Sequence, residues 1–155
     1  MRALGIDYGN RRIGLALSDA TGLLARPWKT ILREGNPGQV AARLGAEIAA
    51  LEAEDDGLAA VVIGLPRRLS GEEHEQTRAV RIVAEQLRKV SSLPLHFQDE
   101  RLTSHEAEAL LARREKDWRK RKAALDAAAA AVILQDYLDG ANTARSRDAD
   151  PGDVV

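Results

Sequence analysis

The chain has 155 residues, of which 24 are acidic and 23 are basic, so its formal net charge of −1 does not by itself indicate a class of charged partner. It contains no Cys, which excludes disulfides and thiolate metal sites. Because it shows neither a leader-like start nor a long apolar run, we expect a cytoplasmic protein without a membrane span, built as one domain over residues 1–138.

The first predicted strand, Ala3–Ile6, runs directly into a carboxylate, Asp7. An acid that continues a buried strand must be hydrated, paired or bound to a cation. Gly9 and Gly14 bracket a predicted tight hairpin that leads into a second strand, Ile13–Ser18. Asp7 therefore lies at a strand end beside a turn, where it either starts the turn through its own backbone contacts or contributes to a site.

Strands and helices alternate in the rest of the sequence. A third strand is predicted over Leu23–Ile31, and apolar residues spaced three and four apart then predict a helix that ends at Asp55–Gly57. The β-branched run Ala59–Gly64 is typical of a strand covered on both faces. A second helix is expected from about Glu72, followed by a short strand over Pro94–Gln98 and two more helices.

This order of elements predicts an α/β fold with a mixed five-stranded sheet, in which three antiparallel strands precede two parallel strands and helices flank the sheet. Right-handed crossovers are expected to join the later strands. The stretch from Asp139 onward has almost no apolar residues, so residues 139–155 are expected to form a disordered tail.

Two adjacent acids, Asp99 and Glu100, follow the last predicted strand. Ligand sites in open α/β sheets lie outside the carboxyl ends of the strands, so this pair can share a crevice with Asp7 if the two strands run parallel and close together. The alternative is that both acids solvate a loop and favour the start of the next helix, where Thr103 and Glu106 fit a capping box.

A third acid, Asp126, lies in a predicted helix that is rich in alanine. The stretch Lys122–Leu134 includes seven alanines, and such a slim helix can approach a sheet closely enough for Asp126 to join the acids at the strand ends. An acid early in a helix is also favoured by the helix dipole alone. Carboxylates without a His or Cys cluster match Mg²⁺ or Mn²⁺ rather than zinc. His74, His96 and His105 show no ligand spacing and are interpreted as surface or packing residues.

A basic segment, Arg113–Lys122, precedes Asp126 and is expected to be a loop between two helices. Seven of its residues are basic and two are acidic. Such a segment can bind nucleic-acid phosphates without reading sequence, or it can be a solvated charge run. Trp118 within it either stacks on a base or pins the loop to the body of the domain.

The segments GIDYGNRRIGLALSD, VVIGLPRRLSG, DERLTS and KAALDAAAAAVILQ occur in the order and spacing of one known family, over about residues 3–138. The chain resembles the YqgF (RuvX) family, the Holliday-junction resolvase-like or pre-16S rRNA nucleases of the ribonuclease-H-like superfamily. The resemblance implies a ribonuclease-H-like nuclease domain over residues 1–138 whose catalytic and metal-binding acids are Asp7, Glu100 and Asp126, with Asp99 as the alternative ligand. The nucleic-acid-binding residues expected from the resemblance and the basic segment are Arg12, Arg101, Thr103, Arg113, Arg114, Lys116, Arg119, Lys120, Arg121 and Lys122.

The resemblance also implies divalent-metal-dependent hydrolysis of phosphodiester bonds, in processing the 5′ end of pre-16S rRNA, in resolving Holliday junctions, or in both. Two divalent ions about 4 Å apart can activate water and neutralise the phosphate, and the acids would hold them. Two other interpretations stay open: a non-catalytic module that binds nucleic acid, and an actin-like or sugar-kinase-like ATPase, which would need a second domain and a second phosphate loop. A homodimer, which paired cuts in a junction would require, is also left open.

Overall fold

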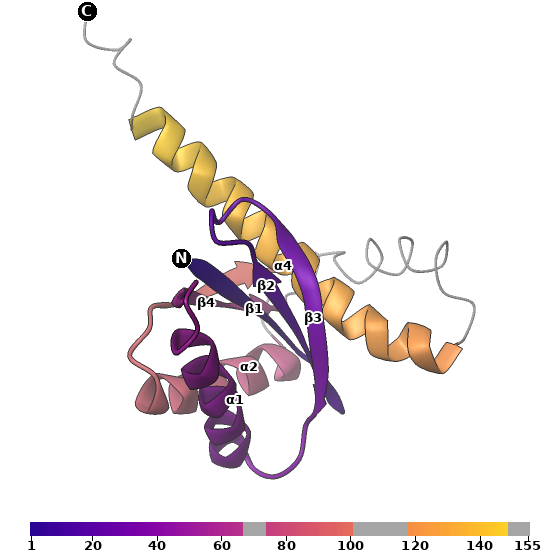
Figure 1. Cartoon of the computed structure of the whole chain (residues 1–155). Helices are drawn as coiled ribbons and strands as arrows, with labels where there is room; N and C mark the ends of the chain where they lie inside the picture. Colours follow the sequence, from indigo (N-terminus) through magenta and orange to yellow (C-terminus); the bar gives the residue numbers. More distant parts are fainter. Residues whose placement is uncertain (67–73, 101–117, 149–155) are drawn as a thin grey trace, which may run out of the picture.

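The computed structural model describes residues 1–66, 74–100 and 118–148. Its centre is one mixed sheet in the order β3-β2-β1-β4-β5 (Figure 1). Strands β1, β2 and β3 pair antiparallel, whereas β4 runs parallel to both β1 and β5, which confirms the predicted fold class. The strands are β1 (Arg2–Tyr8), β2 (Arg12–Ser18), β3 (Ala25–Leu32), β4 (Leu58–Leu65) and β5 (Leu95–Asp99).

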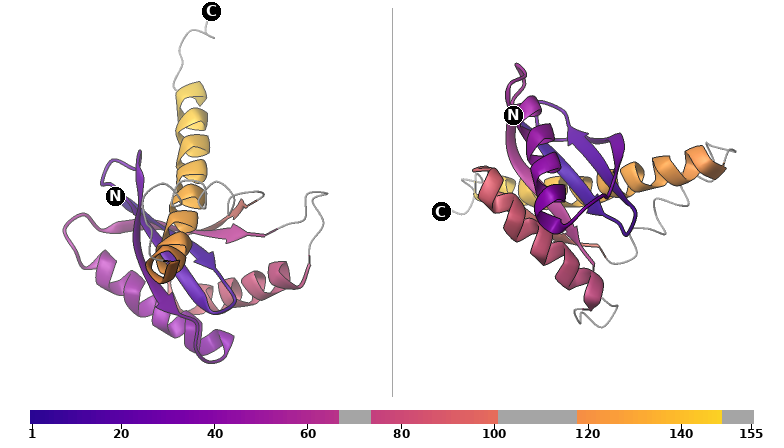
Figure 2. Two further views of the ribbon diagram at one scale, coloured as in Figure 1. Left: turned by 90° about the vertical axis from the view of Figure 1, so that its right-hand side faces the viewer. Right: turned by 90° about the horizontal axis from the view of Figure 1, so that it is seen from below.

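Three described helices cover the two faces of this sheet: α1 (Pro37–Glu52), α2 (Glu75–Val90) and α4 (Trp118–Asp148). Figure 2 shows α1 and α2 on one face and α4 crossing the other. Helix α2 begins at Glu75, later than the predicted Glu72, because His74 caps it by accepting a hydrogen bond from the Gln76 amide. None of the described helices combines the length and the hydropathy of a membrane span.

The two faces of the sheet are packed by side chains of different size. The face toward α1 and α2 carries large aliphatic side chains, such as the fully buried Leu4, Ile6 and Leu15. The face toward α4 carries small ones, including Ala3 and Ala16. Because side chains alternate between the faces of a strand, the odd-numbered positions of β1 all point toward α4.

Helix α4 packs with its backbone directly against glycines of the sheet. A Cβ atom added to Gly14 would overlap the carbonyl group of Asp126, and one added to Gly5 would lie 2.7 Å from the Cβ of Leu134. The expectation that an alanine-rich helix approaches the sheet closely is therefore confirmed. The close approach also requires the glycines of β1 and β2, because a side chain at either position would overlap α4. The sequence patterns described above do not predict this role.

Two sequence-based boundaries at α4 need correction. Residues 118–122, expected in a loop, form the start of α4, which is consistent with the high helix propensity of Arg and Lys. Helix α4 also continues to Asp148, beyond the predicted start of the tail at 139. Its C-terminal half has few apolar side chains, and hydrogen bonds from polar side chains attach it to the rest of the domain. Gln135 donates to the carbonyl of Leu23 over 2.9 Å, and Asn142 donates to the carbonyl of Gly22 over 3.3 Å. The predicted helix beginning at Thr103 and the end of the tail lie outside the described residues.

Substituting Gly14 with Ala tests the contact between α4 and the sheet. The added methyl group meets backbone, which cannot rotate away, so we expect a loss of roughly 1–3 kcal/mol in the free energy of unfolding. Urea denaturation followed by circular dichroism measures this change. Gly140→Ala is the matched control, because no atom lies within 4 Å of its added Cβ and an exposed helical Gly→Ala change stabilises by up to about 1 kcal/mol. Equal stability of Gly14→Ala and the wild type would refute the close contact.

Candidate metal and phosphate site

Asp7 and Glu100 meet on the face of the sheet that α4 covers. Asp7 lies on β1 in the same row as Gly5, and the amide of Glu100 donates to the carbonyl of Leu65 over 3.3 Å at the end of β4. A Cβ added to Gly64 would come within 2.5 Å of Glu100 Oε2, so the Glu100 carboxyl lies over this glycine. The two acids thus come together across the intervening strand β4, as the expectation of neighbouring parallel strands required.

The two carboxyl groups share a hydrogen bond and hold their protons tightly. Burial, then the charge of Asp7, raises the pKa of Glu100 to about 8. Burial also raises the pKa of Asp7 to about 6, and the charge of Asp126 adds to this, while the hydrogen bond with Glu100 acts in the opposite direction. At neutral pH the pair therefore carries one proton, with Glu100 donating it to Asp7.

Asp126 lies beside this pair but contacts a different partner. Its Oδ2 atom is 2.9 Å from Nε of Arg12, the first residue of β2. It lies more than two turns inside α4, so the interpretation that it merely complements the start of the helix dipole does not fit its position. Its negative charge still reaches Asp7, since it contributes to the raised pKa of that carboxyl.

The donor set fits a hard divalent cation at Asp7 and Glu100. Two carboxyl groups that keep a proton between them at neutral pH have an excess of negative charge, which a cation can neutralise in place of that proton. Among the described residues, no three His, Cys, Asp or Glu side chains lie close enough to hold one ion together. The structure therefore brings two of the predicted acids together, with Asp126 adjacent, and leaves Asp99 exposed.

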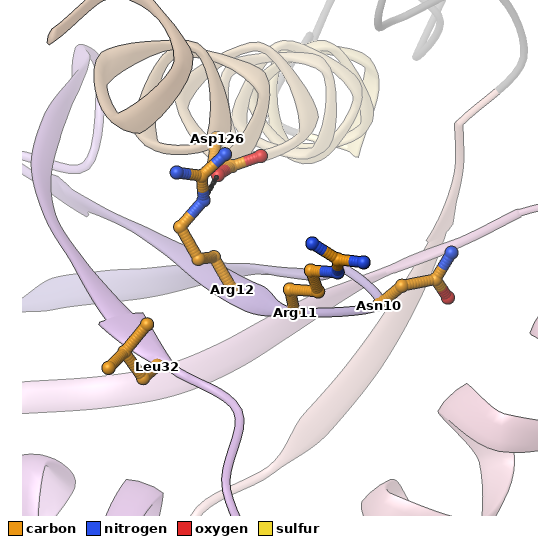
Figure 3. Close-up of a pocket in the computed structure, with 5 residues that line it drawn as sticks. All are labelled: Asn10, Arg11, Arg12, Leu32 and Asp126. Atoms are coloured by element: carbon orange, nitrogen blue, oxygen red, sulfur yellow. Dashed lines mark ion pairs between the residues drawn. The ribbon is translucent and has the colours of Figure 1, made fainter. Parts of the chain in front are cut away.

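A pocket of about 460 Å³ opens next to Asp126, under the N-terminal half of α4. It is lined by Asn10, Arg11, Arg12, Leu32 and Asp126 (Figure 3). Arginine side chains bind phosphate through several N–H donors at once, so this pocket has the chemistry of an anion site. Of its two arginines the sequence analysis selected one, Arg12. The other, Arg11, could have been found from its place in the same glycine-bracketed hairpin.

The hairpin that carries both arginines is held by several polar contacts. The Gly9 amide donates to the carbonyl of Arg12 over 3.0 Å, and the Arg33 amide donates to the carbonyl of Arg11 over 2.9 Å. The Arg33 guanidinium lies 4.2 Å from the ring centroid of Tyr8, and Gln76 donates to the carbonyl of Tyr8 over 2.8 Å. These contacts fix the backbone of the pocket, leaving its side chains as the movable part.

Two of the histidines considered in the sequence have packing roles away from this site. His74 caps α2, and His96 stacks on Tyr137 at a centroid distance of 5.1 Å, which are packing roles as expected. The side chains of Arg101, Thr103, Arg113, Arg114, Lys116, Arg119, Lys120, Arg121, Lys122 and His105 lie outside the described residues. Their assignment to nucleic-acid binding stays a prediction.

A family profile and individual relatives both place this chain in one family. The profile of the RuvX family, described as "Holliday junction resolvase", matches residues 1–140. A protein of Nocardioides sp. named "Putative pre-16S rRNA nuclease" is 43% identical over 98% of this chain and 94% of its own length. A protein of the same name from Koribacter versatilis is 41% identical over 89% of this chain and 86% of its own.

The fold has solved counterparts as well. Thermus thermophilus RuvC superposes with a TM-score of 0.55 at 14% identity, covering 92% of this chain and 97% of its own. The same protein in complex with a Holliday junction substrate gives a TM-score of 0.57 at 16% identity, covering 92% and 96%. This likeness confirms the ribonuclease-H-like fold.

The carboxyl pair predicts an unusual dependence of stability on pH. Both folded-state pKa values exceed the ordinary 3.8 and 4.5, so the native protein binds more protons than the unfolded chain. In a chelating buffer, the stability that the protonated pair contributes is therefore greatest below the ordinary values of 3.8 and 4.5 and is lost progressively as pH rises to the folded-state values of about 6 and about 8. Each pH unit of pKa displacement corresponds to about 1.4 kcal/mol.

Glu100→Gln removes the repulsion while keeping the size of the side chain. As pH rises from about 5.5 to about 8.5, the midpoint temperature of thermal unfolding should fall less for this variant than for the wild type. Asp99→Asn, one residue away and exposed, is the control and should decline like the wild type. A pH profile that is the same for Glu100→Gln and the wild type would show that the two carboxyls do not interact.

Proposed function

The chain belongs to the RuvX family of Holliday junction resolvases, and we propose that it is a divalent-metal-dependent endonuclease acting on structured nucleic acid in the cytoplasm. The family and the names of its relatives support a nuclease. The observation that carries metal dependence is the Asp7–Glu100 pair, two carboxyls at the carboxyl ends of parallel strands that share a proton.

In the proposed reaction, the carboxyl groups bind the cation and the arginines bind the phosphate. A bound Mg²⁺ or Mn²⁺ would supply an activated water and neutralise charge on the scissile phosphate. Asp7 and Glu100 would hold this cation, which would take the place of the proton between them. Arg11 and Arg12 bind phosphate in the adjacent pocket, and Asp126 completes the acidic edge of the site next to them.

The arrangement favours recognition of backbone rather than base sequence. The pocket offers guanidinium groups, which contact phosphates, and these position a substrate without reading its sequence. The basic segment Arg113–Lys122, which carries seven positive charges, is proposed to extend this contact along the substrate. A homodimer is proposed for paired cuts in a junction.

We propose precursor 16S rRNA, cut at its 5′ end, as the first substrate, because relatives 43% and 41% identical to this chain are named "Putative pre-16S rRNA nuclease". A four-way DNA junction is the second candidate, supported by the description of the family. Cleavage of both substrates by one preparation, at equal substrate concentration, decides between them. Cleavage of neither, with binding of both, would support the non-catalytic module instead.

Asp7→Asn tests the proposed chemistry. This change keeps the size of the side chain but removes a cation ligand, so we expect the cleavage rate with Mg²⁺ or Mn²⁺ to fall at least about a hundredfold, with folding retained. Glu100→Gln should behave in the same way, whereas the exposed Asp99→Asn should cleave within a few-fold of the wild type. Single-turnover cleavage assays measure these rates. Wild-type cleavage by Asp7→Asn would contradict the proposal, and loss of cleavage in Asp99→Asn alone would move the ligand from Glu100 to Asp99.

A further inference from the structure

Arg12 occupies the boundary between the carboxyl groups and the phosphate pocket. Its Nε atom is 2.9 Å from Asp126 Oδ2, and the same side chain lines the pocket with Arg11 (Figure 3). A guanidinium group has five N–H donors, so one contact to a carboxylate leaves others for a second partner. One side chain therefore takes part in both halves of the site.

In the protein without a bound cation, the Arg12–Asp126 ion pair reduces the electrostatic repulsion among the acids. Asp126 lies near Asp7, and its charge raises the pKa of that carboxyl. Arg12 partly neutralises Asp126 and so reduces the repulsion among the acids. A divalent cation at the carboxyls would do the same, and its charge would repel the guanidinium. Cation and guanidinium are thus alternative counter-ions for one acidic edge.

We propose that Arg12 exchanges partners: without a divalent cation it is the counter-ion of Asp126, and when the cation binds it turns into the pocket to hold a substrate phosphate. This inference rests on the proposed function and adds a coupling to it, since cation binding prepares the phosphate site. Arg12 is then a positioning residue for Asp126 before the substrate arrives. It becomes a phosphate ligand afterwards.

The structure makes this exchange a movement of one side chain. The backbone of Arg12 is fixed, because its carbonyl accepts from the Gly9 amide over 3.0 Å and its strand pairs with Leu32 of β3. Both side chains of the ion pair are about one quarter exposed, at 26% and 25%, so a rotation of the Arg12 side chain toward the pocket does not require the core to open. Arg11, exposed in the same pocket, provides a matched comparison.

The most direct test follows the Arg12 side chain in the full wild-type protein by NMR, with Mg²⁺ alone as the probe. The Nε–Hε resonance of Arg12 should move on titration with Mg²⁺ and reach the position it already has in Asp126→Asn without the ion. The corresponding resonance of Arg11 should change much less. An Arg12 resonance that stays unchanged while Mg²⁺ saturates the protein would overturn the exchange. Because this overturning outcome is read from the wild type alone, it does not depend on the folding of Asp126→Asn.

A second test compares Arg12→Gln with Arg11→Gln, which remove the same charge from the same pocket. If Arg12 competes with the cation for Asp126, Arg12→Gln should bind Mn²⁺ more tightly, by up to about fivefold, the range for a partly exposed ion pair. Arg11→Gln should bind Mn²⁺ nearly as the wild type does. Isothermal titration calorimetry without nucleic acid measures both. Equal affinity in Arg12→Gln and Arg11→Gln would overturn the exchange.

The coupling to nucleic acid gives a third readout. With Ca²⁺ in place of the catalytic ion, binding of duplex DNA by the wild type should show a steeper salt dependence than in a chelating buffer, by up to about 0.9 in log–log slope for one added phosphate contact. Arg12→Gln should lack this increase, whereas Arg11→Gln should keep it. An increase of equal size in Arg12→Gln would overturn the exchange.

Failure of the exchange and failure of the proposed function give different results. If the wild type binds Mn²⁺ and cleaves, but the Arg12 readouts do not change, the nuclease stands and the exchange is refuted. If the wild type binds no Mn²⁺, the proposed function is refuted and the exchange is refuted with it.

Discussion

The close contact between the backbone of α4 and the sheet is the constraint on which the site depends. Gly5 and Gly14 leave no side chain between the helix and strands β1 and β2, and Gly64 leaves room for the Glu100 carboxyl over β4. A larger residue at any of these positions would raise the helix or displace the acid. Asp126 reaches the strand ends only because its own backbone rests on Gly14.

This contact encloses charge that the fold would otherwise avoid. Glu100 and Asp7 are partly buried with a third acid nearby, and their raised pKa values record how unfavourable the ionised form is without a cation. An apolar pair of similar size would suit this position better for stability alone. Groups whose pKa values are shifted by burial and by a specific charged neighbour cluster at functional sites, and that neighbour, Asp126, lines a pocket with two arginines.

Local patterns in the sequence suffice for the sheet. The alternation of strands and helices predicts the mixed sheet, and an acid that continues a buried strand predicts a candidate site at the end of β1. Local sequence leaves the choice between Asp99 and Glu100 open, although the period-two rule separates them once the faces are known: His96, four positions before Glu100, stacks on Tyr137 of α4, so Glu100 shares its face. Which face of the sheet α4 covers is tertiary information that no local pattern in the sequence contains.

Other features could not be read from sequence for the same kind of reason. Residues 118–122 belong to the basic segment that is predicted as a loop between two helices, but the high helix propensity of their Arg and Lys residues prevails and they start α4. Helix α4 continues beyond its last apolar residues because Asn142 and Gln135 donate hydrogen bonds to carbonyls of the loop after β2. These contacts join residues more than a hundred positions apart. The Arg12–Asp126 ion pair joins residues with a similar separation in sequence, and no local pattern predicts it.

The central claim is that Asp7 and Glu100 hold a divalent cation in place of their shared proton. Isothermal titration of Mn²⁺ at pH 7, repeated in buffers of different ionisation enthalpy, counts the protons released as the ion binds. The account predicts a release of up to about one proton in the wild type, lost in Glu100→Gln together with most of the affinity. Binding of Mn²⁺ without proton release, and with the same affinity in Glu100→Gln, would contradict it.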